Sequence, residues 1–105
     1  MVELDKDSFD EKVINSKDLC LVDYFGDTCE PCKALMPKVH ALSEEYTGKV
    51  NFYSFNTSKA RRLAIREKRL GLPTIAIYKD GAKVKEVTKE EATIENIKSM
   101  VDSML

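Results

Sequence analysis

Residues 19–25 read Leu-Cys-Leu-Val-Asp-Tyr-Phe, an almost unbroken apolar run with one acidic residue inside it. The run is too short for a typical helix and has the length of a strand. Side chains of a strand point alternately to the two faces of its sheet, so a strand that is apolar at successive positions must be covered on both faces. The run therefore predicts a central strand in a sheet that carries helices on both sides.

The rest of the chain alternates between helical and strand patterns. Ser8-Phe9-Asp10-Glu11 has the form of a capping box and predicts the start of a first helix. Asp80-Gly81 lies between two runs of strand character and predicts a β-hairpin. The predicted elements are helices over 8–14, 30–46, 58–69 and 93–104, and strands over 19–25, 50–55, 73–78 and 83–88. This order predicts an α/β fold with a mixed sheet, in one domain spanning residues 1–105.

Composition and charge exclude several classes of protein. With 43% hydrophobic and 33% charged residues, the chain is expected to be globular and not disordered. No apolar run approaches the roughly 20 residues that cross a bilayer, and the N-terminus is acidic where a signal peptide is basic. We therefore expect a cytoplasmic protein without membrane contact. The net charge of −1 argues against binding of nucleic acid.

Basic residues are concentrated between positions 59 and 69, where six lysines and arginines face one glutamate, a local net charge of +5. Such a stretch is commonly a solvated helix face. The alternative is a surface that attracts an acidic partner.

Two of the three cysteines, Cys29 and Cys32, form a C-x-x-C pair where the predicted central strand gives way to a helix. The unpaired N–H groups and positive dipole of a helix start favour a thiolate, so we expect Cys29 to be the nucleophile and Cys32 the buried resolving thiol. The alternatives are half of a zinc site or two unrelated buried cysteines. Zinc needs four ligands, but Cys20 and His40 are the only other soft donors and both are expected to lie far away. We therefore expect a redox pair and no metal. Cys20 is expected to be a small buried hydrophobe.

Asp23 interrupts the central apolar run. Burial would raise the pKa of its carboxyl group. It could lie beneath the C-x-x-C pair and exchange a proton with Cys32. Alternatively, it is a strand-end residue that hydrogen-bonds the following loop.

Five segments together resemble the thioredoxin family, with matching order and intervals over the whole chain. They are Val22-Asp23-Tyr24-Phe25, Cys29-Glu30-Pro31-Cys32-Lys33, Pro37, Gly71-Leu72-Pro73-Thr74 and Lys79-Asp80-Gly81. The resemblance implies the thioredoxin fold, a three-layer α/β/α arrangement around a central mixed sheet. It also implies dithiol–disulfide exchange with disulfide-containing protein substrates, no bound cofactor, and electrons from a flavin-dependent thioredoxin reductase. We expect the chain to act as a monomer.

The resemblance also implies roles for individual residues. Cys29 would attack, Cys32 would resolve, and Asp23 would be the buried acid and base. Pro73 would be a cis-proline facing the disulfide, and Leu72 would offer its backbone to a substrate strand. With Glu30 and Pro31, these two residues form the expected substrate-binding surface.

Four positions depart from the family pattern. Thr28 stands in place of a tryptophan, Glu30 in place of a glycine, Ser54 in place of a buried lysine, and one of residues 89–91 in place of a glycine. The departure at Ser54 implies a different proton path beside Asp23, and the departure at residues 89–91 changes the substrate-docking surface. Together the differences suggest an electron donor specialised for one reductase system. Two other functions compete with a reductase: a binding module that docks an acidic partner through residues 59–69, and a disulfide oxidant or isomerase.

Overall fold

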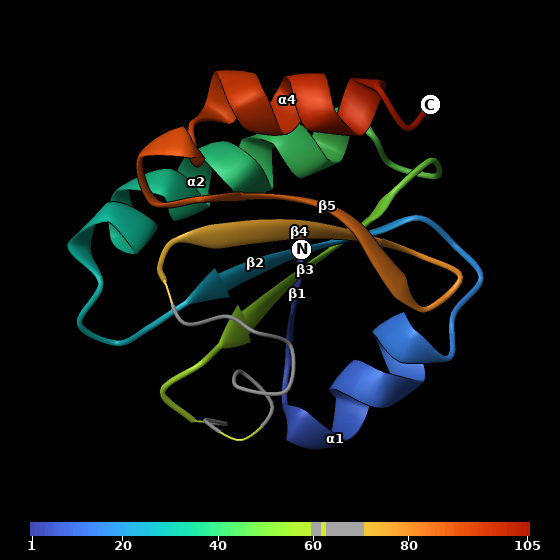
Figure 1. Ribbon diagram of the computed structural model, residues 1–105, viewed down its shortest axis with the longest axis horizontal. Coiled ribbons are helices and arrows are strands. Elements are labelled where there is room, and N and C mark those ends of the chain that lie inside the picture. Colours follow the sequence, from blue (N-terminus) through green and yellow to red (C-terminus); the bar gives the residue numbers. More distant parts are fainter. Residues whose placement is uncertain (60–61, 63–70) are drawn as a thin grey trace.

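A five-stranded mixed β-sheet forms the centre of the computed structural model, which describes residues 1–59, 62 and 71–105 (Figure 1). The strands are β1 (Val2–Leu4), β2 (Cys20–Phe25), β3 (Asn51–Asn56), β4 (Thr74–Lys79) and β5 (Ala82–Thr88). Their order across the sheet is β1-β3-β2-β4-β5. The first three strands in this order are parallel, whereas β4 is antiparallel to both β2 and β5.

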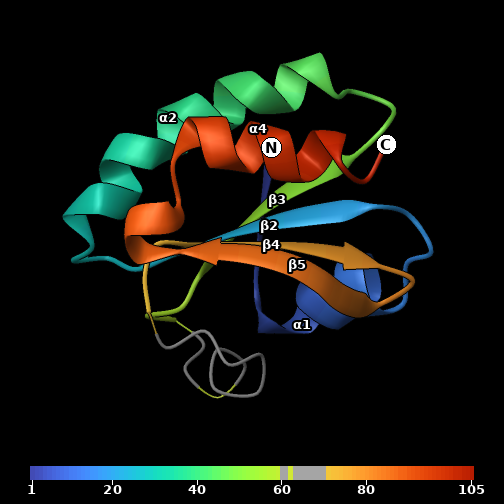
Figure 2. The same cartoon turned by 45° about the horizontal axis from the view of Figure 1, so that its top comes forward.

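Helices cover both faces of this sheet. They are α1 (Lys6–Phe9), which continues into a π-helical turn η1 (Asp10–Ile14), α2 (Glu30–Glu45), a 3₁₀ turn η2 (Lys89–Glu91) and α4 (Ile94–Asp102). Figures 1 and 2 show α2 and α4 side by side on one face and α1 on the other. The three-layer arrangement expected from the sequence is therefore confirmed. Within the described parts of the chain, every helix is too short or too polar to cross a lipid bilayer.

The central strand β2 is buried on both faces, as its apolar run predicts. Leu21 packs in the cluster beneath α2 and α4, whereas Val22 and Tyr24 pack with Phe9 in the cluster beneath α1. Because side chains alternate along a strand, Asp23 points to the same face as Leu21. The acidic side chain therefore lies on the α2 side of the sheet.

Two local predictions differ from the structure. The capping box at Ser8 is wrong, because Asp5 is the N-cap of α1 and Ser8 is its third helical residue. The Asp5 carboxylate accepts from the backbone N–H of Ser8 at 2.8 Å, and the Ser8 hydroxyl accepts from the N–H of Asp5 at 2.9 Å. Strand β1 was not predicted. Most of the helix expected over residues 58–69 falls outside the described residues.

Candidate active site

The C-x-x-C pair lies at the beginning of α2, and its two cysteines are joined by a disulfide with the Cα atoms 5.3 Å apart. Cys29 is the N-cap of the helix, and its sulfur accepts from the backbone N–H of Cys32 at 3.2 Å. Cys29 is partly exposed, whereas Cys32 is only 1% exposed. The two sulfurs therefore differ in access, with the outer one at the positive end of the helix.

The loop between β2 and α2 fixes the position of Cys29. The backbone N–H of Cys29 donates to the carbonyl of Gly26 at 3.2 Å and closes a tight turn. A Cβ atom on Gly26 would come within 3.1 Å of the Leu72 side chain, so the loop carrying Leu72 packs closely against this turn. Pro31 follows in the first helical turn, where a missing N–H leaves no unpaired acceptor.

The second loop of the site contains Pro73, whose peptide bond with Leu72 is cis, as the resemblance implied. The Pro73 carbonyl accepts from the backbone N–H of Lys89 at 2.8 Å, so η2 is held against this loop. Pro31 and Pro73 line one shared groove of about 310 Å³. The structure therefore brings the disulfide loop and the cis-proline loop together.

The Glu30 side chain is exposed to solvent, and Glu30 directly follows Cys29 in the chain. Its carboxylate forms an ion pair with the ammonium group of Lys33 at 3.4 Å, one helical turn away. Both side chains are exposed, so this pair contributes little to stability. It places one negative and one positive charge next to the disulfide.

Asp23 is buried in β2 on the α2 side of the sheet, with 1% of its surface exposed. Neither carboxylate oxygen has a hydrogen-bond partner among the described residues, and burial raises the pKa of Asp23 to about 7. Its neighbour on β3 is Ser54, where the family pattern has a lysine. The reading of Asp23 as a strand-end residue bonded to the loop is thus not supported by its contacts.

Cys20 and His40, the remaining soft donors, take no part in the site. Cys20 is buried in the cluster beneath α1, on the face of the sheet opposite to α2, and burial raises the pKa of its thiol. His40 is exposed on α2. Across residues 1–59, 62 and 71–105 no three metal-binding side chains come together.

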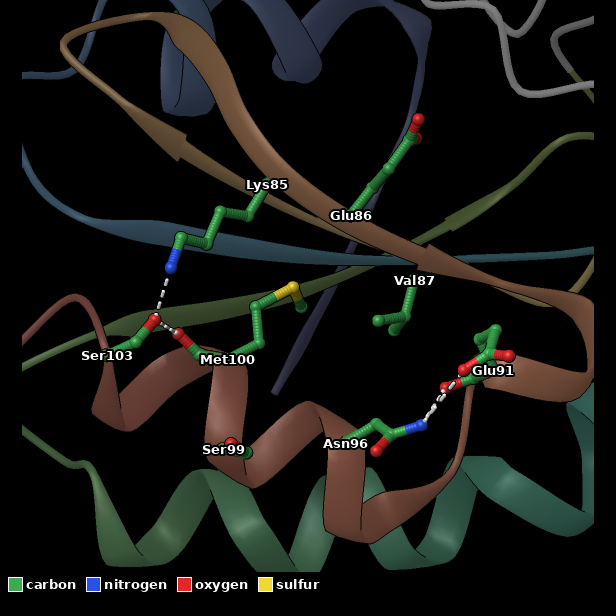
Figure 3. A pocket seen from close by; sticks show the side chains of 8 residues that line it. All are labelled: Lys85, Glu86, Val87, Glu91, Asn96, Ser99, Met100 and Ser103. Carbon is green, nitrogen blue, oxygen red and sulfur yellow. Dashed lines mark hydrogen bonds between the residues drawn. The ribbon is translucent and has the colours of Figure 1, made fainter.

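A second and larger hollow, of about 440 Å³, lies between β5 and α4 and contains no cysteine (Figure 3). Polar side chains on its walls are already bonded to one another. Lys85 donates to the Ser103 hydroxyl at 2.6 Å, and the Asn96 amide donates to the Glu91 carbonyl at 2.9 Å. We therefore locate the chemistry at the disulfide and not in this hollow.

Lys89 is a residue of the site that the sequence alone does not single out. The family pattern has a glycine at one of residues 89–91, but the contact that makes Lys89 important cannot be read from the chain. Lys89 adopts a positive φ of 51° and its side chain lies over Gly71, next to the cis-proline loop. Only the departure from the family pattern signalled it.

Comparison with known proteins agrees with the geometry of the disulfide site. The thioredoxin family model matches residues 1–103. A thioredoxin from Peptoclostridium acidaminophilum is 59% identical over 101 residues, covering 96% of this chain and 92% of the relative. Thioredoxins from Acetoanaerobium sticklandii, 54% identical over 96% of both chains, and Allochromatium vinosum, 34% identical over 89% of this chain and 91% of the relative, also match. The chain therefore belongs to the thioredoxin family, whose members bind no cofactor, and it is a disulfide oxidoreductase that acts by dithiol–disulfide exchange.

Proposed function

We propose that the chain reduces protein disulfides with Cys29 as the attacking thiol and Cys32 as the resolving thiol. The single observation that carries this assignment is the difference in access between the two sulfurs, with Cys29 partly exposed at the helix start and Cys32 buried. A substrate sulfur can reach the first but not the second. The alternative function, a binding module that docks an acidic partner, is not favoured, because such a module needs no pair of redox-active cysteines.

The exchange takes place in two steps. The Cys29 thiolate attacks one sulfur of the substrate disulfide, which forms a mixed disulfide and releases the other substrate sulfur as a thiolate. The Cys32 thiolate then attacks the Cys29 sulfur and releases the second substrate thiolate. The substrate gains two electrons, and the protein is left with the Cys29–Cys32 disulfide.

Asp23 acts in this scheme as the acid and base for Cys32. Its carboxyl group points to the α2 side of the sheet, and its pKa of about 7 lets it hold or release a proton near neutral pH. Removing the Cys32 proton produces the thiolate that resolves the mixed disulfide. Asp23 returns the proton when the disulfide is reduced again.

The substrate is held by the surface around the disulfide. Pro31 and Pro73 line the same groove, and Glu30 is exposed next to Cys29. Leu72 precedes the cis-proline and offers its backbone groups to an extended substrate segment. Such pairing through main-chain groups accepts many sequences.

Family members exchange electrons with a thioredoxin reductase and with disulfide-containing proteins. We assign to this chain a flavin-dependent reductase, a monomeric state and a cytoplasmic location. The bacterial thioredoxins among the relatives support the cytoplasmic location. A single domain over residues 1–105 is supported by the sheet, because it joins strands from β1 near the N-terminus to β5 in the C-terminal quarter of the chain.

Serine variants of the two cysteines test the assignment of roles. Cys32→Ser should form a mixed disulfide with a substrate protein that persists, since nothing resolves it, whereas Cys29→Ser should form none. Mass spectrometry after mixing each variant with a disulfide substrate gives the readout. Cys20→Ala is the control and should turn over normally. Trapping by Cys29→Ser would show that the roles are reversed.

A further inference from the structure

The groove beside the disulfide has an apolar floor and a charged rim. We call it the Pro31–Pro73 groove. It is built from the first turns of α2, the cis-proline loop, η2 and the start of α4. Its apolar members are Pro31, Ala34, Leu35, Pro73, Ala92 and Ile94. Its charged members are Lys38, Lys89 and Glu95.

Lys89 is fixed in this rim by its backbone. Its N–H donates to the Pro73 carbonyl at 2.8 Å, and its φ of 51° lies in the left-handed region that a lysine seldom adopts. The side chain extends over Gly71, because a Cβ atom on that glycine would lie 2.6 Å from Lys89 Cε. The end of the lysine therefore lies beside the loop that contains the cis-proline.

The two lysines of the rim are not held in ion pairs. Neither Lys38 nor Lys89 forms an ion pair with any residue in the described part of the chain. Two lysines and one glutamate leave an excess of one positive charge. A positive rim over an apolar floor is complementary to an extended segment that carries an apolar and an acidic side chain.

We propose that Lys89 is a specificity-determining residue that favours substrate segments with an acidic side chain next to the reacting cysteine. Lys38 supports the same preference from α2. The inference rests on the proposed function, since the segment occupies the groove while its cysteine reacts with Cys29. Lys89 acts on the recognition of the segment and takes no part in the exchange of the sulfurs.

Matched disulfide peptides test this preference. Three peptides differ only in the residue next to the cysteine, which is Glu, Gln or Lys, and kcat/KM is measured for each at low salt. The wild-type protein should reduce the Glu peptide about two- to fivefold faster than the Gln peptide, the range expected for one exposed ion pair. The Lys peptide should be slower than the Gln peptide. The ratios should approach one at high salt.

Two variants locate the preference at Lys89. Lys89→Gln should bring the Glu-to-Gln ratio close to one. Gly71→Ala keeps every charge but displaces the Lys89 side chain, so it should also lower the ratio. Lys49→Gln removes one exposed charge after the far end of α2, and as a matched control it should keep the wild-type ratio.

The failure of this inference differs from a failure of the proposed function. If the wild-type protein reduces the peptides but Lys89→Gln keeps the wild-type ratio, Lys89 does not select acidic segments. A wild-type ratio of one would likewise overturn the inference while leaving the exchange reaction intact. If the wild-type protein reduces none of the peptides, the proposed function fails first.

Discussion

The carboxyl group of Asp23 is buried without a hydrogen-bond partner among the described residues, and burial raises its pKa from 3.8 to about 7. The Asp23 carboxyl group therefore binds its proton less tightly in the unfolded chain than in the folded chain. Between roughly pH 4 and pH 7 the folded state therefore binds more protons, so the free energy of unfolding falls as the pH rises and stays low above pH 7. A shift of this size corresponds to about 4 kcal/mol.

Replacing Asp23 by asparagine should therefore stabilise the protein at high pH. Asparagine stays neutral when buried, so at about pH 8 the free energy of unfolding should rise by up to about 4 kcal/mol. Near pH 4 most of this gain should disappear, because the native aspartic acid is then protonated. Urea unfolding of the oxidised protein at both pH values gives the two free energies.

Ser54→Ala is the matched control, since Ser54 is buried beside Asp23 on β3 but carries no charge. Its effect on stability should be the same at both pH values. A gain in Asp23→Asn that does not depend on pH would show that charge burial is not the cause.

Single residues could be predicted from the sequence where they break a strong local pattern. Asp23 is an acid within an apolar run, and Cys29 and Cys32 are spaced for a disulfide at a helix start. Lys89 could not be predicted in the same way. Its position depends on a positive φ and on a contact with Gly71, 18 positions away in the chain.

At the level of helices and strands, local signals were sufficient for long elements and insufficient for short ones. Both Asp5 and Ser8 can cap a helix, and only the three-dimensional structure shows that Asp5 does so. Strand β1 has three residues and is held by pairing with β3, about 50 positions away in the chain. Such non-local pairing leaves little trace in the local sequence.

The β4–β5 hairpin leads to a prediction about Gly81. Gly81 has a φ of 79°, and a Cβ atom there would overlap the carbonyl oxygen of Ile14 at the end of η1. Gly81→Ala should therefore lower the free energy of unfolding by about 2–4 kcal/mol in total. About 1 kcal/mol of this loss comes from the unfavourable backbone conformation, and the rest comes from the displacement of η1. Thermal or urea unfolding measures the loss.

Gly48 provides the matched comparison for this prediction. It also has a positive φ, of 84°, but a Cβ atom there would meet nothing within 4 Å. Gly48→Ala should cost only the backbone part, about 1 kcal/mol. Equal losses in the two variants would mean that contact with Ile14 contributes nothing.

In the whole molecule, the sheet separates the redox site from a second core. The disulfide belongs to the α2 layer, whose cluster includes residues from α2 and α4. The opposite cluster is aromatic, with the Phe9 ring 5.5 Å from Phe55 and 5.9 Å from Tyr78 in edge-to-face geometry. The hydroxyls of Tyr24 and Tyr78 share a hydrogen bond of 2.7 Å in this cluster. The redox-active disulfide and the aromatic cluster that stabilises the fold thus lie on opposite faces of the β-sheet.

This separation predicts that stability can change without a change in redox behaviour. Phe9→Leu removes the ring contacts and part of the buried volume, so the free energy of unfolding should fall by about 1–3 kcal/mol. The reduction potential depends only on the difference between the oxidised and reduced states, and for this two-electron couple about 30 mV equals 1.4 kcal/mol. Phe9 lies across the sheet from the disulfide, so it should affect both states equally. The unfolding losses measured on the oxidised and the reduced protein should therefore agree, and the potential in glutathione buffer should match that of the wild type. Unequal losses, together with a shifted potential, would show that the α1 layer is coupled to the disulfide through β2.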